Sequence, residues 1–281
     1  MGEIAKILND STQALHAFRA AEAAARRMGN DRDVSVAFNR TGDVLLAQGD
    51  LAGALARYEE GLEIKRSLAG ADPSHAARQR DVSVSLERTG DVLLAQGDLT
   101  SALAAHEEGL AIRRRLVRAD PSHAERQRDV SVSLGKRGDV LLAQGDLAGA
   151  LAAYEEGLEI CRRLASADPG HAERQRDLFV ILANLAATAH VQGEPDRACR
   201  HLQEALTIMR PLAERFPEHP RFRDDLRWIE ERRGEWGCGD PVAATRRSGR
   251  HVQTAPLRKA CRAVVHAGSS PAVFFSPACI P

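Results

Sequence analysis

Long apolar runs and aromatic residues are what this 281-residue sequence has least of. No run approaches the roughly 18 apolar residues of a membrane-spanning helix, and the first residues lack the apolar core of a signal peptide. We therefore expect a cytoplasmic protein with no membrane partner. Aromatic residues make up only 4% of the chain. Because strands favour β-branched and aromatic residues, this composition predicts helices.

Cysteine and charge also lack a pattern that would indicate a function. The five cysteines are scattered, without CxxC spacing and without regular pairing with histidine. This indicates reduced thiols that are structural or incidental. The formal net charge is zero, so the chain as a whole has no electrostatic attraction to nucleic acid or anionic lipid.

Motifs for catalysis or cofactor binding are missing as well. The sequence contains no Ser/His/Asp grouping, no phosphate-binding loop and no HExxH segment. Paired glutamates recur at Glu59–Glu60, Glu107–Glu108 and Glu155–Glu156, but adjacent helix positions point apart, so we interpret them as a hydrated face. We expect no catalytic residue, no cofactor, no metal and no small-molecule substrate.

What the sequence does contain is a repeat. The segment from Gly42 to Leu51 returns unchanged at 90–99 and at 138–147, a spacing of 48 residues. Such self-similarity marks an array in which one supersecondary unit stacks on copies of itself. The predicted divisions are a partial N-terminal repeat (1–31), three close repeats (32–79, 80–127 and 128–175), a diverged fourth repeat (176–220), a capping helix (221–236) and a disordered basic tail (237–281).

Each repeat separates into two helical patterns. Val34, Phe38 and Thr41 follow the 3.6-residue period of a buried stripe in the first, and a similar stripe follows in the second. Between them, Gly49 can end one helix in the left-handed conformation and Asp50 can cap the next. So short a connection predicts an antiparallel hairpin.

Prolines suggest where the helices are interrupted. Asp72 and Pro73 fit the N-cap and first position of the helix that follows, with a kink expected near Arg80. In the fourth repeat, Glu194 and Pro195 still allow a helix to start. Pro211 predicts that this helix ends or kinks early.

Both ends of the sequence allow two interpretations. Sliding the first residues by 40 positions places Asn9–Asp10 on the Gly49–Asp50 turn, so the chain begins inside a repeat, either as a degenerate repeat or as a fragment of a longer array. After residue 236 the periodicity stops and six basic residues face one acidic residue. This segment is either an evolved flexible tail or read-through of a shifted frame. Contact of the tail with nucleic acid or acidic lipid is a weaker alternative.

The repeats resemble the tetratricopeptide repeat. The family's pattern of large and small residues is met in the second repeat by Leu86, Thr89, Gly90, Leu93, Gly97, Ala102, His106 and Gly109. The repeat length of 48 residues, against about 34 in the common form, resembles the long variants of kinesin light chains and bacterial signalling proteins. The resemblance implies an all-α, right-handed solenoid of antiparallel helix hairpins that binds proteins.

The first helices line the concave surface in tetratricopeptide arrays, so the resemblance also implies a binding groove. The residues expected on it are Asn39, Arg40, Asp43, Leu46, Glu87, Arg88, Asp91, Leu94, Lys136, Asp139, Leu142 and Asn184, with Gly135 and His190 on the same face. Their ladders of cations, aspartates and leucines would suit a peptide with mixed charge and an apolar anchor. Alternatively, Arg40 and Asp43 pair within one helix and only keep the face hydrated.

One further row repeats at the same spacing: His75, His123, His171 and His219. A metal needs its ligands at about 2 Å, whereas packed helices lie about 10 Å apart. We therefore expect these histidines to cap helices or pack in loops.

The sequence thus predicts a non-catalytic scaffold that binds a protein or peptide partner whose identity it does not reveal. The alternative is a sensor or regulatory fragment of a larger bacterial signalling ATPase or protease. An enzyme in its own right is the weakest of the three hypotheses.

Overall fold

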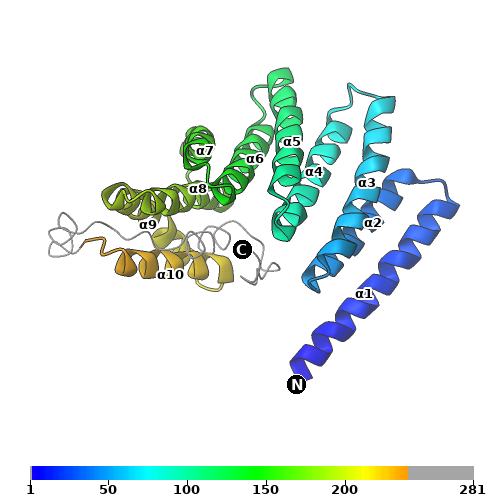
Figure 1. The fold of residues 1–281 in the computed structure, drawn as a ribbon, viewed down its shortest axis with the longest axis horizontal. Coiled ribbons are helices and arrows are strands. Elements are labelled where there is room, and N and C mark those ends of the chain that lie inside the picture. Colours follow the sequence, from blue (N-terminus) through cyan, green and yellow to red (C-terminus); the bar gives the residue numbers. More distant parts are fainter. Residues whose placement is uncertain (1, 240–281) are drawn as a thin grey trace. The chain divides into compact units, whose positions relative to one another are not determined.

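A computed structural model describes residues 2–239, with side chains from residue 11 onward. Every regular element in this range is a helix, and none of these residues forms a strand. The helices are α1 (Gly2–Arg27), α2 (Asp31–Ala47), α3 (Leu51–Ala71), α4 (Ala76–Gln96), α5 (Leu99–Ala119), α6 (Ala124–Ala143), α7 (Leu147–Ala167), α8 (Ala172–Val191), α9 (Pro195–Arg215) and α10 (Pro220–Glu235) (Figure 1). They form two compact units, α1–α5 and α6–α10.

Helix pairs are the building block of both units. In the first unit α2 packs on α3 and α4 on α5, and in the second α6 packs on α7 and α8 on α9 (Figure 1). Contacts between α3 and α4, and between α7 and α8, join successive pairs within each unit. The first unit begins with α1 on α2, and the second ends with α10 on α9. The predicted all-α fold of helix hairpins is confirmed.

The tight turn inside each hairpin has the predicted geometry. Gly97 ends α4 at a φ of 83°, a left-handed conformation that glycine adopts without strain. Asp98 then caps α5, because its Oδ1 accepts a hydrogen bond of 3.0 Å from the Ser101 backbone N–H. Asp50 and Asp146 cap α3 and α7 in the same way.

The connection between hairpins differs from the prediction. Asp72 is the residue that ends α3, and its Oδ1 accepts a 2.7 Å hydrogen bond from the Ser74 hydroxyl. The N-cap of α4 is His75, whose Nδ1 accepts from the Arg78 backbone N–H at 3.4 Å. His123, His171 and His219 occupy the N-cap positions of later helices but form no side-chain capping hydrogen bond. Within this row, capping by the side chain is therefore confirmed for His75 alone. α4 includes Arg80 within one continuous helix.

Two other helices are longer than expected. α9 passes through Pro211 and is 21 residues long, the same length as α7. The expectation that it ends early is therefore wrong. Met209 and Leu212 are buried on either side of the proline, and their burial offsets the one backbone hydrogen bond that proline removes. α1 passes through Asn9 and Asp10, where the alignment places a turn, since no glycine stands there to reverse the chain.

Glycine faces a ring where the two helices of a repeat cross. A Cβ added to Gly90 would lie 2.7 Å from the His106 imidazole. The same close approach joins Gly42 to Tyr58 and Gly138 to Tyr154. The fourth repeat has Ala186 and Leu202 at these positions, both fully buried. A glycine therefore faces a ring in the first three repeats, and an alanine faces a leucine in the fourth.

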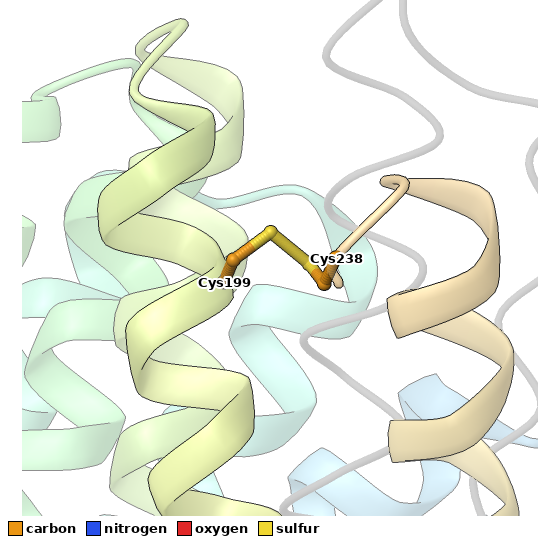
Figure 2. Close-up of a disulfide and its surroundings, with 2 residues drawn as sticks. All are labelled: Cys199 and Cys238. Atoms are coloured by element: carbon orange, nitrogen blue, oxygen red, sulfur yellow. A yellow bond between two sulfur atoms is a disulfide. The ribbon is translucent and has the colours of Figure 1, made fainter. Parts of the chain in front are cut away.

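A disulfide between Cys199 and Cys238 ties α9 to the turn that follows α10 (Figure 2). The expectation that the cysteines are reduced is therefore wrong for this pair. The two residues are 39 positions apart, and packing of α10 on α9 brings their Cα atoms to 5.3 Å, which spacing alone does not reveal. Cys161 is a free, buried thiol. Residues 237–239, predicted to begin the disordered tail, form a turn, and the rest of that segment, 240–281, lies outside the described residues.

Candidate partner-binding surface

The expected groove residues lie on α2, α4, α6 and α8, the first helix of each repeat. They differ widely in exposure. The Arg40 side chain is 61% exposed, whereas Asn39, Leu142 and Asn184 are buried. Gly135 on the same face is also buried, and the remaining members are partly exposed. Only part of the set is therefore open to a partner in either unit.

Asp43 is the centre of a polar network in the first unit. It accepts a 2.8 Å hydrogen bond from the Tyr58 hydroxyl and pairs with Arg88 of the next repeat. The Arg88 guanidinium also lies over the Tyr58 ring, 5.9 Å from its centroid. Burial and the neighbouring Asp43 carboxylate raise the pKa of Tyr58, so the hydroxyl stays a hydrogen-bond donor. Arg40 is a more distant partner of Asp43, at 3.8 Å.

Asp139 has the same role in the second unit. It accepts a 2.7 Å hydrogen bond from the Tyr154 hydroxyl and a 3.2 Å bond from the Asn184 amide. Asn184 is equivalent to Arg88 in the repeat, so the aspartate of one hairpin again contacts the residue at that position in the next. These ladder residues join hairpins, and a partner would meet them already paired.

Glu87 and Asp91 also have partners within the first unit. Glu87 pairs at 2.6 Å with the buried Arg113 of α5, and Asp91 lies 3.6 Å from Nε2 of His106. Leu46 packs partly buried against the cluster of Ala54, Tyr58 and Val92. These contacts leave fewer side chains for an apolar or charged ligand than the sequence suggests.

A row of valines on the same helices was missed by the sequence reasoning. Val36 lies one helical turn before Arg40 and is 46% exposed, one of the two large apolar residues that stand out from the described surface. Val84, Val132 and Val180 occupy the equivalent positions and are partly exposed. Their recurrence at 48 residues, four positions before the basic ladder, was the signal that could have found them.

His190, the last candidate of this face, is covered by the C-terminal turn. Its ring stacks on Trp236 with centroids 4.2 Å apart. Burial lowers the pKa of His190, so the ring is neutral at physiological pH. This histidine therefore belongs to the packing of the second unit.

Neither a metal site nor a membrane span is found in the part of the chain that the structure describes. No three His, Cys, Asp or Glu side chains there converge as metal ligands would. None of the helices in this part combines the length and apolar character needed to cross a bilayer.

Comparisons with known proteins identify the repeat. Two family models, both described as "Tetratricopeptide repeat", match the chain. One matches residues 36–76, 85–123 and 131–173, and the other matches residues 180–204. No curated protein sequence matches the chain. Among solved structures, BtubC (BKLC) from P. vanneervenii is similar, with 16% sequence identity and a TM-score of 0.59 over 87% of this chain and 95% of that one. At this identity the similarity shows the fold alone. Because the matches together span more than half of the sequence, this chain belongs to the tetratricopeptide repeat family.

Proposed function

We propose that this protein is a non-catalytic scaffold that binds a protein or peptide partner on the face made by α2 and α4. The observation that carries this proposal is the exposed stripe of Val36, Arg40 and Asp43 on α2. Residues spaced by four and three positions share one side of a helix. The stripe combines an apolar side chain, an exposed cation and an anion, which suits an extended or helical peptide of mixed charge.

The paired residues refine which side chains would contact a partner. Arg88 is held by Asp43 and Tyr58, so changing it would disturb the hairpin contact as well as the surface. Arg40 has only the long contact to Asp43, and its loss would leave the fold intact. The groove set of the sequence analysis stays a proposal, with Arg40 as its most accessible charged member and Val36 added to it.

A photo-crosslinking amino acid at Val36 of the full-length protein tests this surface. We expect specific crosslinks that are lost when Arg40→Glu is added. The matched control is Arg227→Glu on α10, which makes the same change of charge at a side chain that is 68% exposed. Crosslinks that persist in the Arg40→Glu variant, or that the control removes equally, would place the binding surface elsewhere.

The cytoplasmic location predicted from the sequence stays a prediction. The Cys199–Cys238 disulfide argues against a cytoplasmic location, because reducing compartments keep most cysteines as free thiols. The regulatory-fragment hypothesis also stays a prediction, and no feature of the described residues favours it over the scaffold.

A further inference from the structure

The first unit holds a cavity of about 260 Å³ between α2, α3 and α4. Its lining side chains are Arg32, Ser35, Lys65, Leu68, His75, Ala77, Arg78 and Asp81. Three of these are permanent or strong cations and one is an anion. The cavity lies within one compact unit and involves none of the expected groove residues.

Lys65 is the unusual member of this lining. It is only 8% exposed, and its Nζ donates one hydrogen bond of 2.7 Å, to the Ser85 hydroxyl. Among the residues that the structure describes, no carboxylate lies within ion-pair distance of it. A buried ammonium without a carboxylate is costly, and burial lowers the pKa of Lys65 to about 8. The ammonium has capacity for further acceptors.

At the positions equivalent to Lys65, the other repeats either pair the cation with a carboxylate or have an uncharged residue. Arg113, in the second repeat, pairs at 2.6 Å with Glu87. The residue equivalent to Glu87 in the first repeat is Asn39, which has no charge to offer Lys65. The third and fourth repeats have Cys161 and Met209 there, both buried and uncharged.

An arginine and an aspartate that line the cavity with Lys65 also differ from their equivalents in the other repeats. In the second unit, Arg128 pairs with Asp177, and Arg176 pairs with Asp225 at 2.7 Å. Their equivalents in the first unit, Arg32 and Asp81, line the cavity without an ion pair between them. The Arg–Asp pair is thus formed in the third and fourth repeats and is open in the first repeat, which contains Lys65.

We propose that this cavity binds a small phosphate- or carboxylate-bearing molecule, with Lys65, Arg32 and Arg78 as its cationic contacts. The first turn of α4 places the positive end of the helix dipole on the same side, since Ala77 and Arg78 belong to it. Asp81 opposes the anion, but the three cations outnumber it. The ligand supplies the counter-charge that Glu87 gives Arg113 in the second repeat.

Thermal unfolding of the full-length protein tests the proposal, with sodium phosphate and sodium succinate as separate probes and sodium chloride at equal ionic strength as the reference. We expect a saturable rise in Tm with at least one probe beyond that in chloride. The probe that acts tells whether the site prefers phosphate or carboxylate. Calorimetric titration with the same probe should give one site per chain.

Lys65→Met separates binding from damage to the fold. Methionine is the residue at this position in the fourth repeat, so the variant should have a higher Tm than the wild type without any anion and should lose the response to the probe. Arg66→Met, at an exposed neighbour that pairs with Glu108, removes the same charge and should keep the response. A response no larger than that in chloride, or one that survives in Lys65→Met, would overturn the proposal.

Discussion

At the scale of single residues, the glycine of each helix crossing is explained by the side chain that it faces. A Cβ at Gly90 would overlap the His106 ring at 2.7 Å, and His106 is buried with little room to move. In the fourth repeat, Ala186 faces Leu202, and both are accommodated. A flat ring beside a bare backbone and a branched side chain beside a methyl group are thus alternative ways to fill the same space.

Gly90→Ala should therefore destabilise the first unit, by about 1 to 3 kcal/mol for an overpacked site. The double variant Gly90→Ala/His106→Leu should regain most of the loss, because it recreates the pair of the fourth repeat. Urea unfolding of the two single variants and the double variant forms a double-mutant cycle that measures the coupling. Additive effects of the two changes would show that the ring is not the reason for the glycine.

Gly109 lies inside α5 and is expected to behave in the opposite way. An added Cβ would lie 3.4 Å from the Ser83 carbonyl oxygen and 3.6 Å from the Leu86 Cβ, ordinary contact distances. Gly109→Ala should stabilise the protein by up to about 1 kcal/mol through helix propensity. Gly61→Ala is the control at the equivalent position of α3, where the Cβ would lie 3.0 Å from Asn39 Oδ1, and it should gain less or nothing. A lower Tm for Gly109→Ala would show that close packing needs this glycine.

At the scale of elements, the sequence predicts what local chemistry decides. The helix periods, the Gly49–Asp50 turn and the His75 cap are properties of neighbouring residues, and they could be predicted. The continuation of α9 through Pro211 could not, because burial of Met209 and Leu212 outweighs a local preference. The pairing of Asp43 with Arg88 was missed for the same reason, since it depends on how one hairpin packs on the next.

The disulfide gives α10 a testable dependence on redox state. It closes a segment of 39 residues, for which loop entropy predicts a stabilisation of about 2 to 4 kcal/mol. Cys238→Ser should lower the Tm of the second unit under oxidising conditions, and reductant should lower that of the wild type to the same value. Adding reductant to the Cys238→Ser variant is the control and should change nothing. Equal Tm values for oxidised wild type and variant would show that the bond contributes no stability.

At the scale of the whole molecule, the terminal helices of the array are held by very different contacts. Among residues 11–27 of α1, Ala25 is the buried side chain, and it joins a small cluster with Val34 and Phe38. α10 instead buries Phe222 and Ile229. Array stability is a sum of repeat and neighbour terms, so the weakly attached terminal helix should open first.

α10 has two further attachments to its unit besides this apolar burial. Asp225 forms a buried 2.7 Å ion pair with Arg176 of α8, and the Trp228 ring meets Phe179 edge-on at 6.4 Å. Removing one partner of a buried pair costs about 3 to 5 kcal/mol. Opening of α10 would therefore have to break this ion pair, while the disulfide keeps the end of the helix tethered to α9.

Hydrogen exchange followed by mass spectrometry should reveal this difference. Amides of α1 should exchange through local openings of low free energy, whereas those of α10 should exchange only with the rest of the second unit. Asp225→Ala should accelerate exchange in α10, because it leaves the Arg176 charge without its partner. Exchange in α1 should not change, because both residues of this pair belong to the second unit. If α10 exchanged as fast as α1 in the oxidised wild type, the ion pair and the disulfide would not be what holds this helix in place.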